Sequence, residues 1–240
     1  VLERGTILHH DFRMRARFAL EDDNIEMPVG MRKVWNLILS EDYANKYSAR
    51  GRRPISNITI PQLAEPYTIQ QYLNALCPIP KIKKNVSYDL LMEREGAEES
   101  DIVERPRTYA DLDITFIGSE YPDDFIKTLE KSDNSDGVLI KIIDPLTNIL
   151  WEIMDLFNYF EQANSIQDLS YLHMPSISPH EQNRDFNKWT IILELLRRSI
   201  EACKRNAPEV LEEAMKRWQR YDYPIFKRLI LHATIGGADE

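Results

Sequence analysis

Residues 208–235 read PEVLEEAMKRWQRYDYPIFKRLILHATI, the pattern of two short amphipathic helices joined by a tight turn. Apolar residues recur at spacings of three and four in both halves. Pro208 and Pro224 each suit the first turn of a helix, where the N–H that proline lacks would have no partner anyway. Gly236-Gly237 then ends the second helix. The stretch therefore predicts a helical hairpin and favours a mainly α fold.

Further helices are expected along the chain. The same period predicts a helix over 31–39. We expect another to begin with Asp144 as its N-cap and Pro145 as its first residue, and to run to Phe160. Shorter helices are expected at 68–77 and 122–129.

One more helix is expected after Asp185, which would be its N-cap. Its apolar stripe faces inward and places Arg197, Arg198 and Glu201 on the solvent side. Bulky residues from this helix and from the hairpin are expected to share one core. They are Trp189, Trp218, Phe226 and Leu229.

The middle of the chain is charged. Residues 50–84 hold six basic side chains and one acidic one, whereas residues 89–136 hold fifteen acidic and five basic ones. The sequence predicts short strands at 55–60 and 112–117, whose pairing would be the likeliest cause if the window 79–107 proved to be protected. The polar window 79–107 is expected to be a mobile loop.

Composition restricts the class of protein. The 240 residues carry a net charge of −9, which does not suit a protein whose whole surface binds nucleic acid. Cys77 and Cys203 are far apart, which favours a cytoplasmic protein over a disulfide-rich secreted one. The sequence contains no signal peptide and no transmembrane run of about 18 apolar residues. A start without Met indicates a piece of a longer chain.

The second helix of the hairpin resembles a helix of a HEAT-type repeat. Its residues Asp222-Tyr-Pro-Ile-Phe-Lys227-Arg228 place an acid at the turn and basic residues one turn later. The resemblance implies stacked helical hairpins, as in HEAT or TPR arrays, with a charged, irregular insertion that holds short strands. The expected segments are an N-terminal helical segment at 1–78, the charged insertion at 79–137 and a helical-repeat segment at 138–240.

Residues 140–235 are similar to helical regions of large bacterial anti-phage defence proteins of the STAND NTPase and sirtuin-domain kinds. The similarity rests on Met174-Pro-Ser-Ile-Ser-Pro-His-Glu-Gln-Asn183, a Trp-bearing helix and the hairpin. It implies a segment that senses an invader's protein or holds an assembly together. The chain has no Walker GxxxxGK[ST] motif, so any NTPase or effector would lie elsewhere in the parent protein.

The loop that ends at Asn183 is the most site-like cluster. His180 and Glu181 could supply a general base and its orienting partner. The favoured interpretation is structural, because prolines fix the loop and polar side chains there cap the next helix. No metal site is expected, because the spacing of His173 and His180 matches no common zinc pattern. We expect no catalytic residue and no cofactor.

The six basic residues of the segment 50–84 could contact phosphates, and tyrosines interleaved with them could stack on bases. They are Arg50, Arg52, Arg53, Lys81, Lys83 and Lys84. Pairing with the acid-rich segment 89–136 of the same chain is the favoured alternative, so nucleic-acid binding is not expected.

The sequence thus predicts a non-catalytic helical scaffold or recognition segment of a larger bacterial defence protein. Its partner would be a protein, either a phage protein or another subunit, and the parent protein could be an oligomer. The expected interaction residues are His180, Glu181, Asn183 and the basic set above. The alternative is a nucleic-acid-associated or hydrolytic domain with a site around His180 and Glu181.

Overall fold

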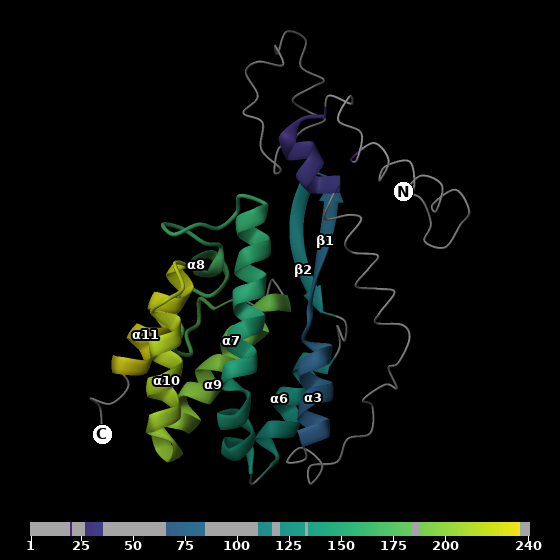
Figure 1. The fold of residues 1–240 in the computed structure, drawn as a ribbon. Helices are drawn as coiled ribbons and strands as arrows, with labels where there is room; N and C mark the ends of the chain where they lie inside the picture. The colour runs from purple at the N-terminus through teal and green to yellow at the C-terminus, as the bar shows by residue number, and fades with distance from the viewer. Residues whose placement is uncertain are drawn as a thin grey trace. The chain divides into compact units, whose positions relative to one another are not determined.

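The computed structural model describes part of the chain, which is coloured in Figure 1. The described residues are 20, 27–35, 66–84, 110–116, 121–132, 134–183 and 188–235. Two compact units are present. One comprises Val1–Arg50 and Pro80–Asp113, and the other, here called the helical unit, comprises Gly51–Ile79 and Ile114–Glu240.

The helical unit is built on two long helices, α7 (Ser135–Tyr159) and α9 (Ile191–Asn206), which make the most extensive contact between any two elements. Both helices bury an apolar stripe at spacings of three and four, as expected for packed amphipathic helices. Ile153 of α7 and Leu196 of α9 are fully buried. A short 3-10 turn, η3 (Lys188–Thr190), leads into α9 and buries Trp189.

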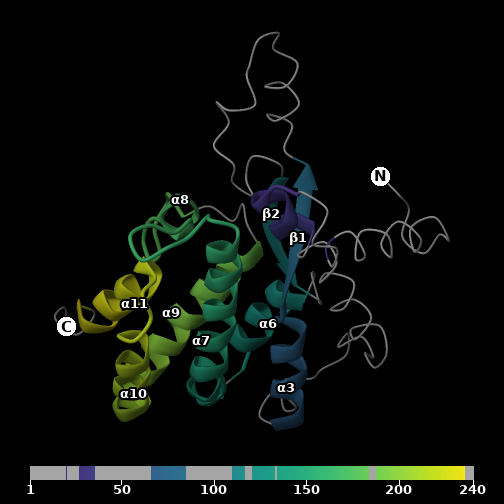
Figure 2. The same cartoon turned by 45° about the horizontal axis from the view of Figure 1, so that its top comes forward.

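The predicted hairpin is confirmed. It consists of α10 (Pro208–Trp218) and α11 (Pro224–Ile235), each beginning at the expected proline. Helices α10 and α11 lie on one side of α7, and α3 and α6 lie on the other (Figure 1, Figure 2). All four predicted core residues are almost completely buried, since none of Trp189, Trp218, Phe226 and Leu229 exceeds 1% exposure.

The start of α7 differs from the expectation. The helix begins at Ser135, so Pro145 lies inside it and Asp144 is not its N-cap. Proline is tolerated here although it removes one backbone hydrogen bond, because tertiary contacts of the buried apolar face outweigh that local cost. The Asp144 carboxylate instead forms an ion pair with Arg217 of α10, at 3.2 Å.

A buried hydrogen bond joins α7 to α10. The Trp218 indole Nε1–H donates to Thr147 Oγ1 at 2.9 Å, and Thr147 Oγ1 donates in turn to the Ile143 carbonyl at 2.8 Å. Trp218 and Thr147 are both 0% exposed. The hydroxyl therefore satisfies the only polar atom of a buried indole.

Thr147→Val is expected to lower the free energy of unfolding by about 1–3 kcal/mol, because it keeps the shape but leaves the Trp218 N–H buried without an acceptor. Urea unfolding of the variant and the parent measures the loss. A matched control is Thr234→Val, since Thr234 is exposed and bonds only within its own helix. Equal stability of the two variants would contradict the role assigned to Thr147.

Two shorter helices complete the helical unit. They are α3 (Pro66–Ala75) and α6 (Tyr121–Glu130), close to the predicted 68–77 and 122–129. Tyr72 and Phe125 pack with ring centroids 4.3 Å apart, and both side chains are buried. Arg198 of α9 reaches Glu130 at 2.9 Å and so ties α6 to α9.

Helix α9 corrects the expectation for Arg197. This side chain is 8% exposed rather than on the solvent face. Its guanidinium donates to Glu194 at 2.5 and 3.0 Å and to Glu201 at 2.6 Å. Two carboxylates on the same helix face therefore compensate the charge and allow its burial. The predicted N-cap Asp185 lies outside the described residues.

Two strands form an antiparallel sheet, β1 (Pro78–Lys84) and β2 (Ala110–Phe116). Strand β2 covers most of the predicted 112–117, and its residues alternate in burial as the sequence alternates in polarity. Its partner among the described residues is β1, and the predicted strand 55–60 lies outside them. The first part of the expected loop 79–107 is therefore a strand, and residues 85–107 are not described.

The other described elements are few. Residues 29–35 form a helix that overlaps the predicted 31–39, and Arg32 Nη1 donates to the Leu20 carbonyl at 2.8 Å. The expected segment boundary at 78 lies one residue from the change of unit after Ile79. The expected boundary at 137 lies within α7.

Candidate interaction surface

The loop 174–183 is held by its own polar side chains. Asn183 Oδ1 accepts from the Ser176 N–H at 3.2 Å, and Asn183 Nδ2 donates to the Ser178 carbonyl at 3.0 Å. His180 Nδ1 accepts from the Gln182 N–H at 3.1 Å, while His180 and Glu181 are exposed. These contacts stay within the loop, and the predicted capping of the next helix concerns residues 184–187, which lie outside the described residues.

The buried carboxylate of Asp168 fixes the segment before this loop to α11. Asp168 is 2% exposed, and its Oδ2 accepts the Ile225 N–H at 2.7 Å, in the first turn of α11. Its Oδ1 accepts the N–H of Ser170 at 2.9 Å and also the Ser170 hydroxyl. Arg228 donates to Ser170 Oγ at 2.8 Å and to the Met174 carbonyl. Ser170 begins the short helix α8 (Ser170–His173), so this network positions α8 against α11.

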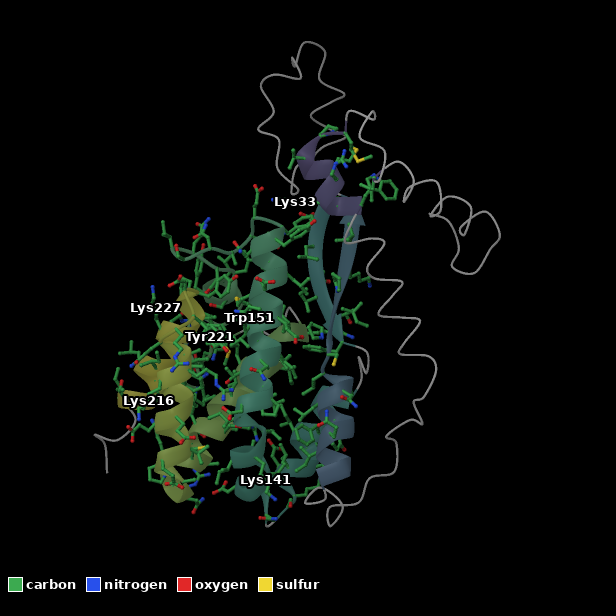
Figure 3. All side chains as sticks on the ribbon, viewed as in Figure 1. Lys33, Lys141, Trp151, Lys216, Tyr221 and Lys227 are labelled. Carbon is green, nitrogen blue, oxygen red and sulfur yellow. The ribbon has the colours of Figure 1, made fainter. Side chains whose placement is uncertain are left out.

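An exposed and a half-buried aromatic side chain meet where α7 passes the turn between α10 and α11. Trp151 of α7 is 39% exposed although it is a tryptophan on a helix with a well-formed core. Its ring centroid lies 6.3 Å from that of Tyr221, at an interplanar angle of 32°. Figure 3 shows the two labelled side chains next to each other at this place. Tyr221 in turn packs on the buried Phe226, with centroids 4.6 Å apart.

The aromatic pair has an acidic border. Asp155 and Asp222 are exposed, and the structure shows no ion pair for either one among the described residues. Both act on Tyr223, whose pKa is raised mainly by burial and then by Asp155, with Asp222 contributing less and a hydrogen bond with Asn158 opposing. Both carboxylates therefore lie within electrostatic reach of Tyr223, and in the sequence Asp155 follows Trp151 by one helical turn while Asp222 directly follows Tyr221. We call Trp151, Tyr221, Asp155 and Asp222 the aromatic surface.

More exposed apolar side chains lie at the end of α7 and just after it. Tyr159 closes that helix at 37% exposure, and Tyr171 and Leu172 on α8 are 54% and 56% exposed. Helix α8 lies beside the C-terminal end of α7 in both ribbon views (Figure 1, Figure 2). The helical unit therefore exposes further apolar area at this end of α7.

The basic residues expected to touch phosphates are not brought together by any described contact. Lys81 is exposed on β1, whereas the side chains of Lys83 and Lys84 and all of Arg50, Arg52 and Arg53 lie outside the described residues. The predicted pairing of this set with segment 89–136 stays a prediction for the same reason.

No group of three or more metal-binding side chains occurs within the described part of the chain. His173, considered with His180 as a ligand, instead packs its ring edge-on against Trp189, with centroids 6.2 Å apart. Burial, with smaller contributions from Glu209, Asp144 and Asp136, raises the pKa of the Cys203 thiol to about 11. Cys203 is therefore a poor nucleophile near neutral pH.

Among the described helices, none combines the length and the apolar character needed to cross a membrane. The chain matches no protein-family model, no curated protein and no solved structure.

Proposed function

We propose that this chain is a helical protein-recognition segment that binds another protein through the aromatic surface. The carrying observation is the Trp151–Tyr221 pair, in which Trp151 is exposed and Tyr221 is half-buried. Tryptophan and tyrosine dominate the binding energy of protein interfaces, because they bury large areas while losing little side-chain entropy. The pair rests on the core of the hairpin through Phe226, so it is already positioned for binding.

The charged side chains beside the aromatic surface indicate which kind of partner segment would bind it. Asp155 and Asp222 border the aromatic pair, whereas the nearby Arg217 is already engaged by Asp144. A partner segment with lysine or arginine beside aliphatic residues would place cations over the ring faces and next to these carboxylates. Arg220, exposed on the same turn, would oppose such a partner.

The biological setting of the proposal comes from the resemblance of residues 140–235 to helical regions of bacterial anti-phage defence proteins. In such a protein the segment would recognise a phage protein or hold another subunit, and the parent chain would carry the NTPase or effector. A cytoplasmic location follows from the same setting.

The alternative, a hydrolytic site at His180 and Glu181, receives less support. His180 Nδ1 already accepts a backbone N–H of its own loop. We therefore expect His180→Ala and Glu181→Ala to change the free energy of unfolding by no more than about 0.5 kcal/mol. The purified chain is assayed against nucleotides, DNA, RNA and esters with divalent metals. Turnover that disappears in either variant would establish the hydrolytic alternative instead.

Site-specific crosslinking tests the recognition proposal in the parent protein. A photoreactive p-benzoylphenylalanine replaces Trp151 in one variant and Leu231 in the control, which is also apolar and is 58% exposed on α11. Cells are irradiated with and without phage infection, and adducts are identified by mass spectrometry. We expect a discrete adduct from position 151 that position 231 does not give. The same adducts from both positions, or none from position 151, would contradict the proposal.

A further inference from the structure

His232 connects α11 to the loop 174–183 across 54 residues of sequence. Its Nδ1 lies 3.2 Å from the Ser178 hydroxyl oxygen. The other ring nitrogen, Nε2, is buried and has no hydrogen-bond partner among the residues that the structure describes. The main-chain carbonyl of His232 accepts a hydrogen bond from Lys204 Nζ of α9 at 2.9 Å, which holds the backbone at this position.

Charged groups on α9 surround the imidazole. Lys204 and Arg197 disfavour a second positive charge there, and Glu201 favours one. Glu201 already forms an ion pair with Arg197 at 2.6 Å, which limits how far it can stabilise a positive charge on His232. The pKa of His232 is accordingly lowered from the usual 6.5, mainly by burial and next by Lys204. On α11, the neighbouring Arg228 points its guanidinium to Ser170 and Met174.

The two protonation states fit this position unequally. A neutral imidazole has one N–H and one lone pair, so it can bond Ser178 through Nδ1 and leave only Nε2 unsatisfied. The imidazolium has two N–H donors and a charge, and its Nε2–H would be buried without an acceptor. An unpaired buried charge and donor are both costly, and rotation of the ring toward water relieves both.

We propose that His232 is a proton-operated latch: protonation of its imidazole breaks the contact with Ser178 and releases residues 175–183 from α11. Ile177, which is 5% exposed within this segment, would then become accessible. Met174 would stay in place, because Arg228 holds its carbonyl and its side chain is buried. The latch involves none of the residues of the aromatic surface.

The direction with pH follows from the lowered pKa. A released ring titrates near the usual 6.5, and the latched ring titrates below it. The latch is therefore at full strength above pH 6.5 and weakens as the pH falls from 6.5 to the lower, latched value. Within that interval the opening equilibrium rises by up to about tenfold per pH unit.

Hydrogen exchange on residues 176–181 and 183, corrected for intrinsic rates, tests the latch at pH 7.5 and pH 5.0; Gln182 is left out because its N–H bonds to His180 Nδ1, which protonation would block as an acceptor. We expect the parent chain to lose protection at the lower pH, and His232→Gln to show no pH dependence. His180→Gln is the matched control, because it removes an exposed histidine of the same loop and should keep the response. Ser178→Ala should already be less protected at pH 7.5.

Three outcomes would overturn the latch. The first is a pH response that survives in His232→Gln. The second is the absence of a pH response from the parent chain while near-ultraviolet circular dichroism shows it folded at both pH values. The third is a titration midpoint at or above 6.5 for the His232 ring in NMR spectra of the parent chain, assigned with the His232→Gln variant.

Discussion

Replacing Trp218 with alanine is expected to lower the free energy of unfolding by about 3–5 kcal/mol. The indole is completely buried between α10 and α7, and its N–H is bonded to Thr147. Truncation leaves a large cavity in a core that α7 and α9 hold rigidly, so the surrounding side chains close it only in part. Urea unfolding, followed by far-ultraviolet circular dichroism, measures the loss.

Trp218→Phe separates packing from hydrogen bonding in the same position. Phenylalanine restores part of the buried area but offers no N–H, so its loss of stability should lie between those of the parent and the alanine variant. In Trp218→Phe, Thr147→Val should cost less than in the parent chain, because no indole N–H remains to be satisfied. A loss below about 1 kcal/mol for Trp218→Ala would show that the α7–α10 contact is not part of the core.

Asp168→Ala is expected to cost about 3 kcal/mol or more, although it removes a small polar side chain. Three donors would lose their acceptor at once: the N–H groups of Ser170 and Ile225 and the Ser170 hydroxyl. Arg228, half buried nearby, would also lose a favourable charge. The variant's urea midpoint gives the cost, and faster hydrogen exchange at 168–174 should show that α8 has separated from α11.

Asp136→Ala is the matched control for Asp168. Asp136 also accepts three hydrogen bonds, two from Arg205 and one from Asn206, but these groups are exposed. Exposed ion pairs contribute little, so this variant should lose no more than about 1 kcal/mol. Equal losses in the two variants would contradict the special role of the buried carboxylate.

The helices that the sequence predicted best are those whose boundaries rest on local chemistry. Pro208 and Pro224 begin α10 and α11 because a proline at the first turn is favourable whatever the rest of the chain does. The same rule was wrong at Pro145, where burial of α7 outweighs one lost hydrogen bond. The burial of Arg197 was missed because it depends on two partners that share its helix face.

The features of the candidate surface were harder to predict, because they join distant segments. Asp168 caps α11 from 57 residues away, whereas a local rule would assign that task to Asp222. Trp151 lies off the buried apolar stripe of α7, and only the fold shows that Tyr221 lies beside it. The bonds of Asn183 to Ser176 and Ser178 were not predicted either, because the sequence suggested that polar side chains of this loop cap the next helix.

The most direct test of the recognition proposal is the affinity of the partner recovered by crosslinking, measured by isothermal titration calorimetry. For the parent chain, Trp151→Ala and the control Leu231→Ala, folding is first verified by thermal unfolding. We expect Trp151→Ala to weaken binding by about 30-fold or more, as for an interface hot spot, and Leu231→Ala to stay within about twofold. Equal affinity of Trp151→Ala and the parent chain would contradict the assignment of this surface to protein recognition.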